Sequence, residues 1–168
     1  MEHKAFLFDF NAFRRELMPL LNDALSTGQL GPLEDFVQQH RADMCQPASG
    51  EPLADDWRGT VEDWDAHQIG DIALTKYYDP LDDRGLGTDW EHLQRQLLEE
   101  VRTDLPLLGV PVGPAEEPFD PGKMGSYFQS PEEVAAHLAL LQRFTGSGEL
   151  SGILRSALEA GTGLYVTF

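Results

Sequence analysis

The chain has 168 residues, 41% of them hydrophobic and 10% aromatic, which predicts one globular domain spanning residues 1–168. Its 29 acidic and 12 basic residues give a formal net charge of −17, which repels phosphate backbones and anionic lipid and argues against a nucleic-acid partner. No apolar run approaches the roughly 20 residues of a membrane-spanning helix, so we also expect no membrane partner. A single cysteine, Cys45, cannot form an internal disulfide, as is typical of a cytoplasmic protein.

The first 41 residues predict a strand followed by helices. Residues 4–10 are expected to form a strand because bulky aromatic and aliphatic side chains dominate them. Asn11 is placed to cap the N-terminus of a helix that Gly28 ends, and Pro19 predicts a kink or break within it. A short helix then follows over about residues 32–41, with a proline in its first turn.

The middle of the chain predicts two helices and a long loop. Thr60 is placed to cap a helix that reaches toward His67, and residues 69–78 continue it if Gly70 does not interrupt. An apolar stripe with helical spacing predicts a second helix from Asp89 to about residue 103. Residues 104–125 are rich in proline and glycine, so we expect an irregular connection there.

The C-terminal part predicts two more helices and a strand. Ser130 begins the first helix, with Glu133 in position for a capping box. The second helix begins near Leu150 and ends at Gly161, and residues 164–168 alternate as a strand.

Because a lone strand leaves backbone groups unpaired, we expect the N-terminal and C-terminal strands to pair with each other. A third strand is expected from residues 105–112 or 124–128, and helices should cover one face of the small sheet. The predicted fold class is therefore α+β, predominantly helical, with about five to seven helices.

The acidic charge is concentrated in one segment. Residues 51–89 contain 11 acidic and 3 basic residues, a net charge of −8, and Trp57 and Trp64 lie among the acids. Aromatic side chains rimmed by carboxylates can anchor a protein partner, while the charge steers a basic partner toward them. An alternative is that the two tryptophans, seven residues apart, share a buried helical face. The predicted partner-binding residues are Asp55, Asp56, Trp57, Glu62, Asp63, Trp64 and Asp65.

A second interpretation of the same segment concerns a metal ion. If the helix includes them, Asp63, His67 and Asp71 lie four residues apart along one face and present two carboxylates around an imidazole. This ligand set suits a divalent metal or acid–base chemistry, and it predicts a metal-dependent hydrolase as the alternative function.

No complete signature of a catalytic nucleophile, a phosphate-binding loop or a dinucleotide site occurs in the sequence, and we expect no cofactor. The leading hypothesis is a non-enzymatic binding protein that engages a basic protein. An inhibitor of a nuclease, or an immunity-type protein that neutralises a toxin, is one concrete form, since such proteins present negative charge to a phosphate-binding site.

Overall fold

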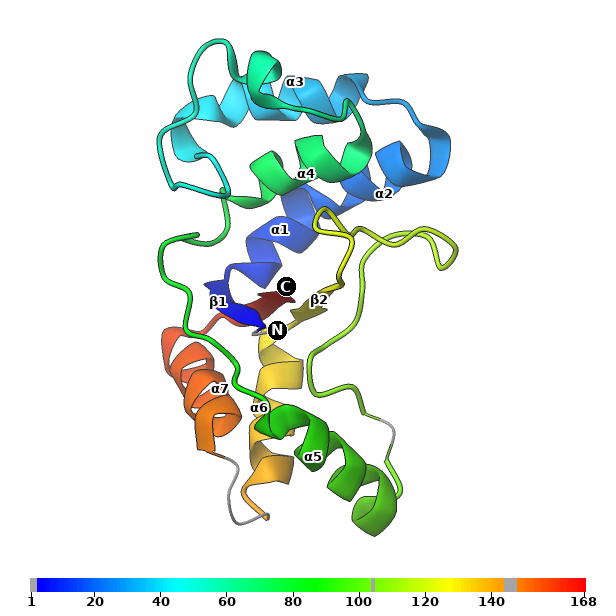
Figure 1. Ribbon diagram of the computed structural model, residues 1–168, viewed down its shortest axis with the longest axis vertical. Helices are drawn as coiled ribbons and strands as arrows, with labels where there is room; N and C mark the ends of the chain where they lie inside the picture. Colours follow the sequence, from blue (N-terminus) through cyan, green and yellow to red (C-terminus); the bar gives the residue numbers. More distant parts are fainter. Residues whose placement is uncertain (1–2, 104, 144–147) are drawn as a thin grey trace.

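The computed structural model describes residues 3–103, 105–143 and 148–168, and a three-stranded antiparallel sheet lies at its centre (Figure 1). The strands are β1 (Lys4–Phe8), β2 (Ser126–Gln129) and β3 (Gly163–Thr167), in the order β1-β3-β2. Tyr165 of β3 lies opposite Phe6 of β1 on one side and Phe128 of β2 on the other. The predicted pairing of the N-terminal and C-terminal strands is confirmed, and the third strand overlaps the predicted 124–128 region.

Seven α-helices in the described residues complete the predicted α+β fold. They are α1 (Phe10–Glu16), α2 (Met18–Thr27), α3 (Gly31–His40), α4 (Ala66–Leu74), α5 (Asp89–Gln96), α6 (Pro131–Leu141) and α7 (Gly148–Ala160). Within the described ranges, none of them combines the length and the apolar character that crossing a bilayer requires.

The helices cover both faces of the sheet, so the expectation that they would cover one face is wrong. Because successive side chains of a strand point to opposite faces, the sheet contributes to two hydrophobic clusters. Phe6 and Tyr165 pack in the cluster shared with α1 to α4, whereas Ala5 and Leu164 pack in the cluster shared with α5 to α7. Figure 1 shows α1 to α4 on one side of the strands and α5 to α7 on the other.

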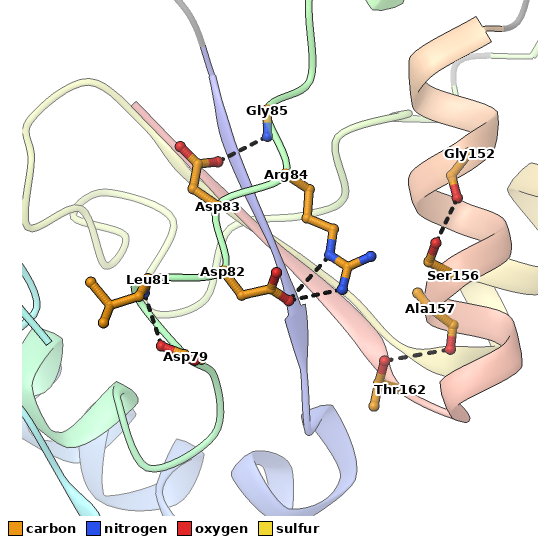
Figure 2. A network of polar contacts seen from close by, with 10 residues as sticks. All are labelled: Asp79, Leu81, Asp82, Asp83, Arg84, Gly85, Gly152, Ser156, Ala157 and Thr162. Atoms are coloured by element: carbon orange, nitrogen blue, oxygen red, sulfur yellow. Dashed lines mark hydrogen bonds and ion pairs between the residues drawn. The ribbon is translucent and has the colours of Figure 1, made fainter.

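A loop segment covers the outer edge of β1. Residues 83–86 run beside the strand, and the backbone N–H of Arg84 donates to the carbonyl of Ala5 at 3.0 Å. The Asp83 carboxylate accepts hydrogen bonds from the backbone N–H of Ala5 at 3.2 Å and of Gly85 at 2.9 Å. Figure 2 shows this segment lying along β1, with Asp83 turned back onto the following turn. Backbone groups that an edge strand would otherwise leave open are thus paired.

The predicted irregular connection contains no named helix or strand in its described residues between Val101 and Ser126, yet it is packed against the fold. Val110 and Phe128 exchange two backbone hydrogen bonds, of 3.0 and 2.9 Å, which pairs the outer edge of β2. Phe119 is fully buried in the cluster beneath α1 to α4. The connection therefore closes one sheet edge and fills part of the core.

Several helices begin where the local capping chemistry of the sequence sets them. The Asp9 side chain accepts a hydrogen bond from the backbone N–H of Ala12 at 3.1 Å, so α1 begins at Phe10 and the predicted cap at Asn11 is wrong. The break predicted at Pro19 is confirmed, because α1 ends before it and Pro19 lies in the first turn of α2. The capping box predicted at the start of α6 is also confirmed.

Helix α4 begins later than predicted, but it continues through Gly70. Thr60 ends a 3-10 turn, Trp57–Thr60, and Asp65 caps α4 instead, accepting from the backbone N–H of Gln68 at 2.8 Å. The helix continues through Gly70, where an added Cβ would lie 2.8 Å from Leu21 Cδ1 and 2.8 Å from a ring carbon of Phe119. Glycine at this position therefore permits the close contact of α4 with its neighbours.

Candidate functional site

The acidic segment folds around one buried tryptophan. Trp57 begins the 3-10 turn and is fully buried, and its indole Nε1 donates to Gln38 Oε1 on α3 at 3.2 Å. A side chain with no exposed surface cannot contact a partner. The predicted binding role of Trp57 is therefore wrong, and the alternative that it belongs to the core is correct for this residue.

Trp64, in contrast, lies on the surface with 42% of its area exposed. Its ring stacks on that of Trp57, with centroids 5.9 Å apart and planes 21° apart, and its Nε1 donates to Glu34 Oε1 at 3.2 Å. These two contacts fix the orientation of the indole while its outer surface stays open to solvent.

The predicted carboxylates divide into those with internal partners and those without. Asp55 forms an ion pair with Arg41 although its side chain is highly exposed, and Asp65 caps α4. Asp56, Glu62 and Asp63 are exposed and make no ion pair or side-chain hydrogen bond with other described residues.

The basic residues of the segment do not neutralise these acids. Arg58 lies over the Trp57 ring and reaches Glu34 at 3.7 Å, and Lys76 bonds Glu16 on α1 at 2.5 Å. Arg84 is held by Asp82, with its Nη2 at 2.9 Å from the carboxylate oxygen, as Figure 2 shows. The negative charge of Glu62 and Asp63 is thus left facing solvent.

Two adjoining hollows lie next to Trp64. The first, about 290 Å³, has apolar walls from α2 and the Trp64 ring, and the second, about 520 Å³, is lined mainly by acidic and polar residues. Asp65, His67 and Glu117 line both. Glu116 and Glu117, from the 104–125 connection, face the second hollow together with Asp63. We call the residues Asp63, Trp64, Asp65, Glu116 and Glu117 the acidic surface.

His67 is oriented by the same connection. Its Nδ1 accepts a hydrogen bond from the backbone N–H of Asp120 at 3.0 Å, its ring stacks on Phe119, and its Nε2 lies 3.8 Å from Glu117 Oε1. An imidazole that accepts at Nδ1 carries its proton at Nε2 when neutral, and that proton points toward Glu117.

The structure does not bring the three predicted metal ligands together. Asp63 precedes α4 and lines the second hollow with His67, whereas Asp71 lines a different pocket. In the part of the chain that the structure describes, no three His, Cys, Asp or Glu side chains are arranged to hold a metal ion. The one-face arrangement fails because the helix begins only at Ala66, so Asp63 is not on it.

The pocket at Asp71 was not predicted from the sequence. It measures about 320 Å³ and is lined by residues from β1, β3, α4 and the loops around them. Asp71, Lys4, Phe6, Tyr78 and Tyr165 are among its walls, and we call it the Asp71 pocket. The Asp71 carboxyl group makes no hydrogen bond or ion pair with any side chain or backbone group in the described ranges.

The electrostatics of this pocket follow from burial. Burial raises the pKa of Asp71 to about 7, and the positive charge of Lys4 lowers it only in part. Burial also raises the pKa of Tyr78 and of Tyr165, and the nearby charge of Asp71 adds to both shifts. Both tyrosines stay neutral, while Asp71 changes its charge near neutral pH.

One local signal could have pointed to this residue. Asp71 is the only charged side chain in the stretch Ile69–Leu74, whose other members are all buried. A single carboxylate in a buried helical stretch is costly unless it is paired or has a function. Its neighbours Lys4 and Tyr165 come from the two ends of the described chain, so nothing in the local sequence links them to it.

No family model, curated protein or solved structure matches this chain. Because a fold alone does not determine function, the function is argued from these two sites.

Proposed function

We propose that the protein is a non-enzymatic binding protein whose acidic surface engages a basic protein partner. The observation that carries the proposal is the environment of Trp64, an exposed and oriented indole next to Glu62 and Asp63, which form no ion pair with other described residues. The net charge of −17 supplies a long-range field of the same sign.

Trp64 has the properties of an interface anchor. Tryptophan, tyrosine and arginine dominate the binding energy of protein interfaces, and an anchor that is already ordered loses little conformational entropy on binding. The stacking on Trp57 and the hydrogen bond to Glu34 provide that order. Truncation of Trp64 to alanine should therefore accelerate dissociation of the partner.

The neighbouring hollows suit basic side chains. Lysine and arginine have an apolar stem and a charged end, and both parts need a complementary wall. The first hollow offers Leu25, Leu30 and the Trp64 ring. The second offers Asp63, Glu116 and Glu117, and its acidic residues outnumber its one lysine, Lys123. A basic partner could thus place stems against the apolar walls and charged ends among the carboxylates.

An inhibitor or immunity-type protein is the concrete form that fits best. Enzymes that bind nucleic acid present clustered cations to phosphate groups, and a rigid acidic surface competes for those cations. Charge complementarity of this kind speeds association, and salt weakens it because the Debye length is only about 8 Å at physiological ionic strength.

A charge-reversal pair tests the proposal. The variant Glu62→Lys/Asp63→Lys reverses two unpaired charges beside Trp64. The matched control, Glu99→Lys/Glu100→Lys, reverses two exposed charges on the opposite side of the sheet, after α5. Both variants change the net charge equally. Partners captured from the native source should be identified, purified and measured for association rate at low and high salt.

The first variant should slow association of the partner about tenfold or more at low salt, and the control should remain close to the wild type. The difference should shrink at high salt. If both variants associate as fast as the wild type, or if both slow equally, the acidic surface is not the binding site.

The metal-dependent hydrolase built on Asp63, His67 and Asp71 remains an untested alternative. A metal that binds the folded state must raise the thermal midpoint of unfolding. Because these three residues are divided between two pockets, we expect no shift with millimolar manganese or zinc. A saturable rise in the midpoint that Asp63→Asn abolishes would restore the metal hypothesis.

A further inference from the structure

The Asp71 pocket is walled by an aromatic cluster next to the carboxyl group. The Phe6 and Tyr78 rings have centroids 4.8 Å apart, Tyr78 and Tyr165 are 5.3 Å apart, and Phe6 and Tyr165 are 6.0 Å apart. Three rings from β1, β3 and the loop after α4 thus pack together beside the pocket, and Tyr78 presents the accessible one because Phe6 and Tyr165 are buried. Ring faces carry negative electrostatic potential, so such a wall attracts cations and rejects anions.

The carboxyl group lies in this pocket without a partner. Asp71 is partly buried and lines the pocket, yet no described residue bonds to its carboxyl oxygens, and Lys4 is not within ion-pair distance. Buried carboxyl groups in proteins are normally hydrogen-bonded or paired with a cation. The Asp71 oxygens are not sealed from solvent, so water or a ligand that enters the pocket can supply the partner that the described residues do not.

We infer that the Asp71 pocket binds a small organic ammonium compound, with its ammonium group at the Asp71 carboxylate and its apolar body against the ring of Tyr78, which Phe6 and Tyr165 support from behind. The volume of about 320 Å³ is at the low end of ligand pockets, which admits a metabolite-sized amine but no peptide segment. This site is separate from the acidic surface, so each proposal can fail without the other.

Other side chains of the pocket limit the ligand further. Gln46, Gln68 and Thr60 line it and offer neutral hydrogen-bonding groups. Lys4 is the other charged side chain among its walls and is exposed. A second positive charge on the ligand would approach Lys4, so monoamines should bind better than diamines of similar size.

Binding should depend on pH through Asp71. The groups that face its carboxyl are Lys4 from β1, Tyr78 after α4 and Tyr165 from β3, and burial raises the pKa of both tyrosines, so they stay neutral between pH 5.5 and 8.5. Only the ionised carboxylate pairs with an ammonium group. With a pKa of about 7 for Asp71, affinity should fall roughly 30-fold between pH 8.5 and 5.5.

Calorimetric titration with monoamines from n-butylammonium to 2-phenylethylammonium tests the inference on the full chain. The neutral isostere 2-phenylethanol is the ligand control. Asp71→Asn removes the charge while keeping the shape, and Asp63→Asn makes the same substitution on the acidic surface as the protein control. Circular dichroism and thermal unfolding establish that both variants are folded.

At pH 8.5 we expect saturable binding of at least one monoamine to the wild type and to Asp63→Asn. The affinity of the same monoamine for Asp71→Asn should be at least tenfold weaker. The alcohol 2-phenylethanol should bind the wild type no more tightly than it binds Asp71→Asn. The inference is overturned if no monoamine binds at millimolar concentration, if Asp71→Asn binds equally well, or if affinity is the same at pH 5.5. Tighter binding of the alcohol would instead assign the pocket to neutral ligands.

Discussion

Replacing Asp71 by asparagine should stabilise the protein, and the gain should grow with pH. The pKa of this carboxyl group is raised from 3.8 to about 7 in the folded state, mainly by burial. A group whose folded-state pKa is raised favours the folded state at low pH. It loses that contribution as pH rises from the unfolded to the folded pKa, here from about 4 to about 7.

The magnitude follows from the two pKa values. A carboxyl group raised from 3.8 to about 7 costs the folded state at most about 4 kcal/mol once it is fully ionised. About half of this cost is already present at pH 5.5, so about 2 kcal/mol is added between pH 5.5 and 8.5. Asparagine does not titrate, and the free energy of unfolding of Asp71→Asn relative to the wild type should therefore rise by about 2 kcal/mol over that interval.

Urea denaturation of both proteins at pH 5.5 and 8.5 measures this difference. All other titrating groups are common to both proteins and cancel in the comparison. The exposed Asp63→Asn variant serves as a control and should show no such rise. If the stability difference between Asp71→Asn and the wild type is the same at both pH values, the carboxyl group is not held in the environment described here.

Three further substitutions test the packing and the helix ends. Gly70→Ala should lower the free energy of unfolding by about 1–3 kcal/mol despite the better helix propensity of alanine, because the added methyl group would lie 2.8 Å from the Phe119 ring. A higher free energy of unfolding in urea would show that this contact is loose. Ser130→Ala should cost about 1 kcal/mol by removing the side-chain cap of α6, and an unchanged urea midpoint would mean that the cap contributes nothing. Burial lowers the pKa of His137, whose Nδ1 lies 2.7 Å from Gln129 Oε1, so below pH 6.5 the unfolded state binds a proton more readily than the folded state. The stability of the wild type should therefore fall more steeply with acidification than that of His137→Gln. Parallel curves of stability against pH would contradict this.

The sequence was informative where local chemistry decides the structure. The bulky side chains of residues 4–10 and the alternation of residues 164–168 predicted both terminal strands, and the need to pair their backbones predicted their contact. Capping at Ser130 and the break at Pro19 also depend on neighbouring residues only, and both are present in the structure.

Predictions failed where a distant contact decides the outcome. The sequence left open whether Gly70 interrupts the helix, and only the contact of α4 with Leu21 and Phe119 explains why glycine fits there. Trp57 and Trp64 look alike in the sequence, and only their tertiary contacts make one buried and the other exposed. The Asp71 pocket depends on side chains from both ends of the described chain, so no local pattern could have predicted it.

The closure of both sheet edges has a consequence for how any protein can associate with this one. A peptide that adds a strand to a sheet needs a row of free backbone N–H and carbonyl groups. In the described structure Arg84 and its neighbours already pair with β1, and Val110 pairs with β2. Strand addition at these positions is therefore disfavoured, and the same pairing protects the sheet from strand-by-strand self-association when the protein is concentrated.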